Sequence, residues 1–437
     1  MLETLVCDVA PRVDAVSPAE WQNLFPDLPD SLEMIQLIQR VGVDGFRFHS
    51  IVVREHERPI LLLPLFEMVY DVSTLVEPAM QPILTAAARK LPQLLRPRLL
   101  GVGFVEAEWG QVGVDPSRNH ETMAAAWDLA LKALDALAEG LGAHLIAFVN
   151  FTPQSGRMLP MGNLTGFGQI AGLPFAQTPI TYSHSDKYIE SLSANMRSSL
   201  RRKLRKAKDV KVLRTRQPGP WLDALYQFYV ETCQRSDVKF SVHSRGFFAS
   251  ICQRIDDAEY ALYFVGERLA AFRLQIVRPD CLIDKYFGMD PVLGREYSLY
   301  FVSWVKDIEY CIANQIPLYH SGLTAEDTKA RLGAQFIHSR ILFRHRQPLV
   351  HCLLTALARR VGYQPSMGLP PVRLGSDWDA VAAAEAIARG AASHGQTSMA
   401  HDAVRDIMDS PLNLSRLKDS TIKPADQAAR YRQEPPS

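Results

Sequence analysis

The chain has 437 residues, of which 47% are hydrophobic and 22% are charged, and these values are typical of a soluble globular protein of two or three domains. The formal net charge of +1 excludes a global attraction to nucleic acid, so we expect no DNA partner and confine any basic surface to a local patch. The longest apolar stretches, such as 60–66, are too short for a membrane helix, and we expect no membrane span.

The cysteines and the amino terminus both indicate a reducing compartment. The six cysteines are scattered without a Cys-x-x-Cys pair, which argues against a disulfide framework and against a zinc site, so we expect no metal. Residues 1–11 carry Glu3 and Asp8 where a signal peptide would carry lysine and an apolar core. We therefore expect a cytoplasmic protein.

The first half of the chain predicts an α/β unit made of a hairpin, a Gly-x-Asp-Pro tetrapeptide, a helix and a strand. These elements occupy, in that order, 48–54 and 60–66, 113–116, 119–141 and 145–151. The second half repeats the order at 260–265 and 269–277, 288–291, 295–315 and 316–320. A shared order of elements indicates that one unit has been duplicated.

The two copies differ by an insertion in the first. It covers 67–100, and its apolar residues from Met80 to Leu91 recur at helical spacing and predict one or two amphipathic helices. We place the first unit at 1–180 and the second, which carries the candidate active site, at 181–350. Residues 351–437 are predicted to form a helical extension that ends in a flexible tail.

A basic segment, 193–208, lies between the two units. Its apolar residues Met196, Leu200 and Leu204 stand four apart, so one stripe of a helix docks while the cations project from the other faces. Only Asp209 is near enough in the sequence to offset these cations. The segment predicts either a solvated helix or an anion site, for a nucleotide-bearing donor or for an RNA backbone.

The strand at 282–287 leads into a loop that opens a helix. Because side chains alternate along a strand, Asp284 and Tyr286 are predicted to share a face on which an amine can be bound and deprotonated. Gly294 and Arg295 stand in the loop, where free backbone N–H groups can hold a pyrophosphate. The alternative interpretation is a surface strand with one wet face.

Charged residues crowd the segment 319–336, which follows the last strand of the second unit. Glu326, Lys329 and Arg331 are expected at the strand ends, where ligands bind in open α/β sheets. His320 precedes them and is a candidate base, because an ordinary imidazole titrates near neutral pH.

Several stretches of the sequence resemble the FemAB-like branch of the GNAT acyltransferase superfamily. They are the order of elements in each half, the basic segment from Ser191, the stretch 298–304, and the segment from Gly322 through Lys329 to Gly333. The likeness covers roughly 21–346 and is most specific over 191–336. It implies an α/β (α+β) fold of two tandem GNAT-like units, each with a mixed sheet flanked by helices.

The resemblance implies an enzyme, an acyltransferase that needs no metal. Lys329 and Gly333 match the family's closing Lys-x-x-x-Gly segment, and Arg197 and Arg201 match its basic inter-domain segment. Aminolysis of a thioester needs alignment, a proton acceptor and stabilisation of an oxyanion. The candidate catalytic residues are Asp284, Glu326 or His320 as base and Tyr286 as proton donor, and the candidate donor contacts are Gly294, Arg295, Lys329, Arg331, Arg197 and Arg201.

Three functions remain open. The leading one is an N-acyltransferase with acyl-CoA or an acyl-carrier-protein thioester as co-substrate, no tightly bound cofactor, and a small-molecule or peptide amine as acceptor. The second is an aminoacyl-tRNA-dependent Fem-type transferase that forms a peptide bond and contacts charged tRNA through 197–208. The third is a non-catalytic scaffold on the same fold.

The donor stays open because two family features are missing from the sequence. The usual acetyltransferase pyrophosphate signature precedes neither helix, and Gly294-Arg295 is at best a degenerate form of it. The long charged helical hairpin of the peptidoglycan-bridging enzymes is missing between Lys208 and Gln347.

Overall fold

The computed structural model describes residues 5–14, 16–26, 28, 30–70, 96–105, 109–235 and 242–361. The described residues all belong to one compact unit, and 375–437 lie outside the described residues. Most of the predicted insertion, 71–95, and the predicted tail beyond residue 361 also lie outside the described residues.

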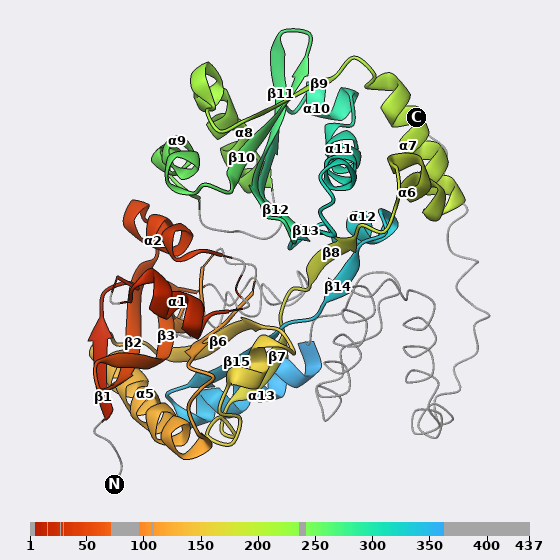
Figure 1. The fold of residues 1–437 in the computed structure, drawn as a ribbon. Helices are drawn as coiled ribbons and strands as arrows, with labels where there is room; N and C mark the ends of the chain where they lie inside the picture. The colour runs from red at the N-terminus through yellow and green to blue at the C-terminus, as the bar shows by residue number, and fades with distance from the viewer. Residues whose placement is uncertain are drawn as a thin grey trace, which may run out of the picture. The chain divides into compact units, whose positions relative to one another are not determined.

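The first sheet is mixed and has eight strands (Figure 1). They are β1 (Leu5–Ala10), β2 (Arg47–Glu55), β3 (Arg58–Val69), β4 (Arg98–Val102), β5 (Gly113–Val114), β6 (Leu145–Phe151), β7 (Gly168–Ala171) and β15 (Arg340–His345). The order is β1-β2-β3-β4-β6-β15-β7, with β5 beside β3. One face packs on α5 (His120–Gly140), and the other packs on α1 (Pro18–Leu24) and α2 (Leu32–Val41).

The second sheet is mixed and has seven strands. They are β8 (Phe175–Pro179), β9 (Lys211–Thr215), β10 (Ala258–Val265), β11 (Arg268–Val277), β12 (Leu282–Met289), β13 (Leu318–Gly322) and β14 (Gln335–Ile337). The order is β14-β8-β13-β12-β11-β10-β9. One face packs on α8 (Leu222–Arg235) and α9 (Arg245–Arg254), and the other packs on α6 (Ser185–Ser191), α7 (Ala194–Lys206) and α11 (Leu299–Ala313).

Short helices connect these layers. They are η2 (Ser155–Met158), η3 (Gly219–Trp221), α10 (Leu293–Glu296) and α12 (Glu326–Arg331), followed by the longer α13 (Pro348–Val361). The extension from 351 to 437 stays a prediction. None of the described helices combines the length and the apolar character that a membrane crossing requires.

Equivalent hydrogen bonds in the two halves confirm the duplication. The Asp115 N–H donates to Ile60 O at 2.9 Å, and the Asp290 N–H donates to Ala270 O at 2.8 Å. Both acceptors are the third residue of the second hairpin strand. Each aspartate then accepts, through Oδ1, the N–H of the residue two positions later, at 3.0 Å in the first copy and 2.8 Å in the second. The Gly-x-Asp-Pro tetrapeptide therefore does the same structural task twice.

The two sheets exchange strands across the predicted unit boundaries. Strand β8, which precedes residue 180, pairs antiparallel with β13 in the second sheet. Strand β15, which follows β14 along the chain, pairs antiparallel with β6 in the first sheet. The boundaries at 180 and 350 stay a prediction, but unfolding of either half would remove a strand from the sheet of the other. We therefore expect 1–350 to unfold cooperatively.

The two equivalent aspartates should differ in their effect on stability. Asp115 is fully buried, whereas the Asp290 side chain is 17% exposed. Replacement by alanine strands more polar groups at the buried position, so we expect Asp115→Ala to lower the unfolding free energy by about 3 kcal/mol and Asp290→Ala by about 1 kcal/mol. Urea unfolding measures both, with the exposed Asp256→Ala as control. An equal loss in the two variants would contradict this reading of the turns.

Candidate active site

The candidate site lies where two parallel strands of the second sheet stop pairing. Strands β12 and β13 pair only at Leu282 with Tyr319 and at Ile283 with His320, although β12 continues to Met289. In the first sheet the equivalent strands β4 and β6 stay paired over four residues. Beyond Ile283 the side chains of β12 are therefore no longer beside a paired β13.

A bulge in β12 begins at the same point. Leu274 of β11 faces Tyr286, while the next residue, Gln275, faces Asp284, so Lys285 is the extra residue. The Lys285 ammonium donates to Asp30 Oδ1 at 2.6 Å, and both side chains are almost fully buried. The extra residue breaks the alternation of side chains, and the predicted shared face of Asp284 and Tyr286 is therefore wrong. The two residues lie on opposite faces of the sheet.

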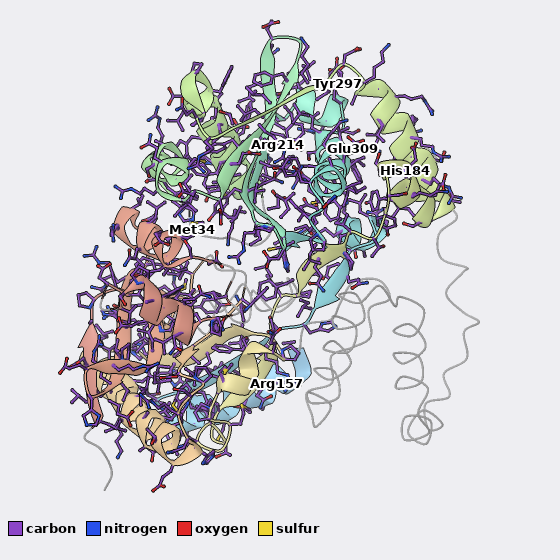
Figure 2. The ribbon with its side chains drawn as sticks, in the orientation of Figure 1. Met34, Arg157, His184, Arg214, Tyr297 and Glu309 are labelled. Atoms are coloured by element: carbon purple, nitrogen blue, oxygen red, sulfur yellow. The ribbon has the colours of Figure 1, made fainter. Side chains whose placement is uncertain are left out.

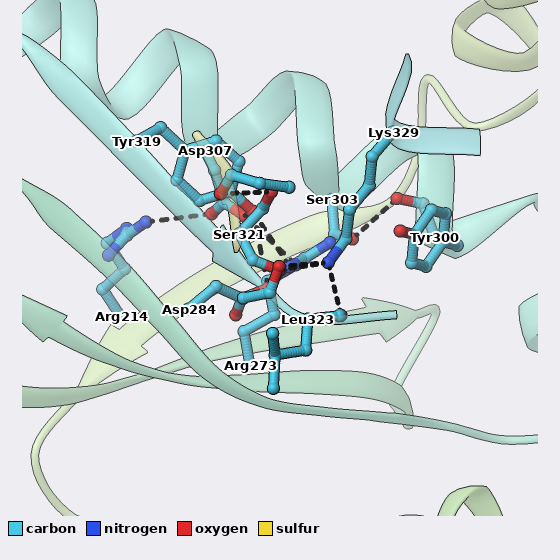
Figure 3. Close-up of polar contacts among 12 residues, drawn as sticks. Arg214, Arg273, Asp284, Tyr300, Ser303, Asp307, Tyr319, Ser321, Leu323 and Lys329 are labelled. Carbon is cyan, nitrogen blue, oxygen red and sulfur yellow. Dashed lines mark hydrogen bonds and ion pairs between the residues drawn. The ribbon is translucent and has the colours of Figure 1, made fainter. Parts of the chain in front are cut away.

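Asp284 belongs to a buried charged cluster on the α11 face (Figure 3). Arg273 of β11, which is 1% exposed, forms an ion pair with Asp284 and places its Nε 3.1 Å from Oδ2 of Asp307 on α11. Its Nη1 donates to the Tyr319 hydroxyl at 3.0 Å, and that hydroxyl donates to Asp307 at 3.2 Å. One guanidinium therefore connects β11, β12, β13 and α11.

A second guanidinium balances the charge of this cluster. Arg214 of β9 (Figure 2) places Nη2 3.4 Å from Asp307 Oδ1 and donates through Nη1 to Glu259 at 2.7 Å. Its guanidinium also lies 3.4 Å from the ring centroid of Tyr310 on α11. Two arginines thus face the buried carboxylates, which offsets the cost of removing the charges from water.

Tyr300 of α11 joins this cluster, with its ring centroid 5.9 Å from the Arg273 guanidinium. Apart from Arg273 Nε, which is ion-paired with Asp307, three polar atoms of Arg273, Asp284 and Tyr300 are buried without a hydrogen bond among the described residues: Arg273 Nη2, Asp284 Oδ1 and the Tyr300 hydroxyl oxygen. An unsatisfied buried group costs about 1–3 kcal/mol, so such groups in a native protein point to a role other than stability. Burial raises the pKa of Tyr300, although the charge of Arg273 opposes the rise. The phenol is therefore protonated at neutral pH and is able to donate.

Tyr286 has a different partner on the opposite face. Its hydroxyl lies 2.6 Å from Nε2 of His243, and its ring packs edge-on against Tyr229 and Phe247. Burial, and then the charge of Lys285, lower the pKa of His243 to about 4. The imidazole is therefore neutral at neutral pH, and Tyr286 is fixed by it among aromatic rings of α8 and α9.

Lys329 of α12 points inward and holds the turn that follows β13. Its ammonium donates to the carbonyl oxygens of Ser321, Gly322 and Leu323 at 2.5, 3.0 and 2.7 Å, and the residue is 4% exposed. An ammonium has three N–H donors. The structure therefore gives Lys329 a set of backbone acceptors in place of the anion that the sequence led us to expect.

The two other candidate bases lie on either side of this turn. Glu326 begins α12 and is partly buried, and burial, followed by the charge of Asp327, raises its pKa. A raised pKa suits a carboxylate that takes a proton near neutral pH. His320 is 5% exposed, with its ring 5.9 Å from that of Trp109. Because its neighbour Tyr319 faces Arg273, His320 points to the opposite face of β13.

The predicted pyrophosphate loop is filled by its own carboxylate. The N–H groups of Val292 and Leu293 donate to Asp290 Oδ1 at 2.8 and 2.9 Å, and the Gly294 N–H donates to Asp290 O at 2.8 Å. These N–H groups are therefore not free for a ligand, contrary to the expectation from the sequence. Arg295 is exposed and donates through Nε to the carbonyl of Pro291 at 2.8 Å.

Gly294 is required for packing. A Cβ at this position would stand 2.6 Å from the Met289 sulfur, so the close approach of α10 to β12 explains the glycine without any ligand.

The remaining predicted donor contacts lie around the start of α7. Arg197 donates to the carbonyls of Glu190 and Leu192 at 2.9 and 3.2 Å, which closes the end of α6, and Arg201 is exposed. Arg331 lines an open groove of about 350 Å³. Its other lining residues are Ser191, Leu192, Ser193, Asp327, Ala330 and Gly333. Arg331 thus lies beside the start of α7. Among the described residues, Asp284 forms its ion pair with Arg273, not with Arg331 or with a cation of α7.

Reasoning from the sequence missed every residue of the charged cluster except Asp284, although the sequence carries a signal for Arg273, Tyr300 and Asp307. Arg273 interrupts an apolar strand and is followed two residues later by Gln275, which predicts a polar stripe on one face. Tyr300 and Asp307 stand seven apart on the predicted helix, with Ser303 between them, and such spacing places all three on one side. No group of three or more potential metal ligands occurs within the described part of the chain.

Residues 194–330 match the family model of the acetyltransferase (GNAT) domain. This stretch runs from α7 into α12 and contains every member of the charged cluster. A comparison with curated proteins found no match.

The fold is similar in outline to several solved structures. FemX is 15% identical with a TM-score of 0.48, and the match covers 78% of this chain and 98% of FemX. A tandem GNAT protein from the clavulanic acid biosynthesis pathway is 10% identical with a TM-score of 0.46, covering 78% and 99%. L-PGS from Bacillus licheniformis is 11% identical with a TM-score of 0.45, covering 82% and 100%. Likenesses at this level do not establish a shared activity.

The buried imidazole of His243 should make stability fall in acid. The folded pKa of about 4 lies below the usual value of 6.5, so the unfolded chain binds more protons between these two values. Stability from this group is complete above pH 6.5 and declines as pH falls, by about 3 kcal/mol at pH 4. The unfolding free energy of wild type minus that of His243→Gln should shrink by that amount between pH 7 and pH 4. A pH-independent difference would contradict the neutral buried imidazole.

Lys329 should matter for stability, whereas Arg331 on the same helix should not. Lys329→Met strands three carbonyl oxygens at the turn, and we expect the unfolding free energy to fall by about 3 kcal/mol. Arg331→Met removes an exposed side chain and should change it by less than about 0.5 kcal/mol. Chemical denaturation compares the two variants, and a stable Lys329→Met protein would refute the structural role.

Proposed function

We propose that the protein uses its GNAT acetyltransferase domain, residues 194–330, as an N-acyltransferase that moves an acyl group from a thioester to an amine. One observation carries this proposal. Within the matched domain, at the point where β12 stops pairing with β13, a buried donor, a buried acceptor and a buried hydroxyl lie unpaired in one cluster. These are the three kinds of group that thioester aminolysis requires.

The reaction forms one bond and breaks one. The amine nitrogen attacks the carbonyl carbon, the C–N bond forms, and the C–S bond then breaks as the tetrahedral oxyanion collapses. The amine loses a proton and the departing thiolate gains one. No covalent bond to the protein is needed, because a neutral amine is already a competent nucleophile.

Each unpaired atom of the cluster fits one part of this reaction. Asp284 Oδ1 accepts an N–H of the amine, orients its lone pair and takes its proton. Arg273 Nη2 donates to the carbonyl oxygen as negative charge develops on it. The Tyr300 hydroxyl, which is protonated at neutral pH, donates to the thiolate. Burial strengthens all three interactions because little water competes.

Glu326 is the second candidate for the base. It is less buried than Asp284 and is not part of the charged cluster, but its raised pKa suits proton transfer near neutral pH. If Glu326 is the base, Asp284 only orients the amine. At saturating amine, kcat then falls further in Glu326→Gln than in Asp284→Asn.

These roles predict that Tyr300 on α11 and Tyr286 on β12 differ in their effect on activity. Tyr300→Phe removes the proton donor and Asp284→Asn removes the proton acceptor, and each should lower kcat/KM by about 100-fold or more. Tyr286→Phe removes the hydroxyl that contacts His243 on the other face and should keep activity within about threefold. Release of free thiol from acetyl, octanoyl and palmitoyl thioesters, with a panel of amines, measures all three.

Two results would count against the proposal. Full activity in Asp284→Asn with a loss in Tyr286→Phe would move the chemistry to the opposite face of the sheet. No release of thiol from any thioester with any amine would oppose the N-acyltransferase function itself.

A further inference from the structure

Helix α7 presents a cationic face to solvent. Met196 and Leu200 are buried in the core between α7, α11 and the second sheet. The cations toward the end of α7 and just beyond it are exposed. The exposed cations are Arg201, Arg202, Arg205, Lys206 and Lys208. Residues 194–208 contain no acidic side chain to offset them. Like charges at this density repel one another, so an anionic surface is favoured next to them.

This cationic face borders the proposed site. Lys203 of α7 places Nζ 4.8 Å from the ring centroid of Phe301, and Lys206 places Nζ 5.8 Å from that of Tyr297. Phe301 stands next to Tyr300 in the first turn of α11, and their ring centroids are 5.8 Å apart. A molecule seated on α7 is therefore beside the segment that carries the proposed proton donor.

The turn formed by Asp290 to Gly294 does not offer a place for a pyrophosphate. The Asp290 carboxylate accepts hydrogen bonds from the N–H groups of Val292 and Leu293. The N–H groups of Glu296 and Tyr297 donate to the carbonyl oxygens of Val292 and Leu293. A pyrophosphate needs several free N–H groups in a concave turn, and here a carboxylate already fills that turn. A donor that is recognised through its pyrophosphate is therefore not favoured at this turn, whereas α7 offers a cationic surface beside the first turn of α11.

We infer that the thioester is delivered by an acidic carrier protein that docks on the exposed cations of α7, an inference that rests on the proposed N-acyltransferase function. A carrier protein holds the acyl group as a thioester at the end of a long arm, so the bulk of the donor remains outside the site. Recognition then requires charge complementarity at the surface and no pyrophosphate contact inside it.

An acidic protein fits this surface better than RNA does. The exposed cations of α7, from Arg201 to Lys206, extend over about 8 Å of helix, a length that matches a short acidic helix. RNA carries a negative charge at every nucleotide and needs a broad basic surface, and nucleic-acid-binding domains are strongly basic as a whole, with a pI above about 9. This chain has a net charge of +1 and a pI of about 7.7, so a phosphate backbone that extends beyond α7 would meet no general excess of cations.

A charge-reversal variant tests the inference. Arg202→Glu combined with Arg205→Glu changes two exposed side chains of α7 and leaves its buried stripe intact. The matched control is Lys132→Glu combined with Arg157→Glu, which reverses two exposed cations of the first half (Figure 2 labels Arg157). The same acyl group is offered on an acidic acyl carrier protein, on coenzyme A and on pantetheine, and thiol release is followed.

The expected result separates the three donors. With the acyl carrier protein, the α7 variant should lose about 100-fold in kcat/KM, chiefly through KM, and the wild-type rate should fall as salt is raised. With the pantetheine thioester, which lacks any carrier, wild type, α7 variant and control should agree within about twofold. Unchanged activity of the α7 variant with the carrier protein, or a wild type that uses acyl-CoA better than the carrier, would overturn the inference.

A binding measurement keeps the inference testable if no thioester reacts, a result that would oppose the proposed function alone. Fluorescence anisotropy of labelled acyl carrier protein gives Kd for the three proteins directly. We expect Kd to rise by about 100-fold in the α7 variant and to stay within about twofold of wild type in the control. Carrier binding that is undetectable in the wild type, or weaker than the binding of bulk tRNA at the same salt, would overturn the docking of an acidic protein.

Discussion

The ion pairing of one buried guanidinium, that of Arg273, holds the strands of the second sheet and α11 together. Arg273 is 1% exposed, and its partners stand on β12, β13 and α11, so these three elements are fixed around a single point. Removing one carboxylate would leave a charge uncompensated in a dry interior, which costs about 3–5 kcal/mol. The same guanidinium leaves Nη2 without a hydrogen bond within the described part of the chain, so it organises the cluster and still has a donor to offer. The proposed chemistry follows from this double property.

The bulge in β12 determines which residues of that strand face the Arg273 guanidinium. Because Lys285 is an extra residue, Asp284 turns toward Arg273 while Tyr286 turns toward His243. Without the bulge, a regular strand would have placed both on one face. The extra residue itself is held by Asp30, which comes from the loop between α1 and α2 of the first half. The position of Asp284 therefore depends on a contact with a segment more than two hundred residues away in the chain.

The sequence predicts the order of elements well and their partners poorly. Hydrophobic periodicity and the repeated Gly-x-Asp-Pro reveal the duplication, and Asp115 and Asp290 indeed make equivalent hydrogen bonds. The exchange of β8 and β15 was not predictable, because a local pattern of apolar residues does not say which sheet receives a strand. Within the site, Asp284 was found from its position on a strand, but its face was not, since a bulge has no signature in strand periodicity. Lys329 was read as an anion contact, because its spacing does not show that three carbonyls surround it.

The proposed N-acyltransferase chemistry requires a thioester carbonyl to bind in the Arg273 cluster, between β12 and β13. A crystal structure of the protein with an unreactive analogue, in which a methylene separates the carbonyl from the sulfur of an acyl-pantetheine, tests it most directly. We expect the carbonyl oxygen within about 3 Å of Arg273 Nη2 and the sulfur beside the Tyr300 hydroxyl. An analogue bound in the groove beside Arg331, or at the Asp290 turn, with the Arg273 cluster unchanged, would contradict it.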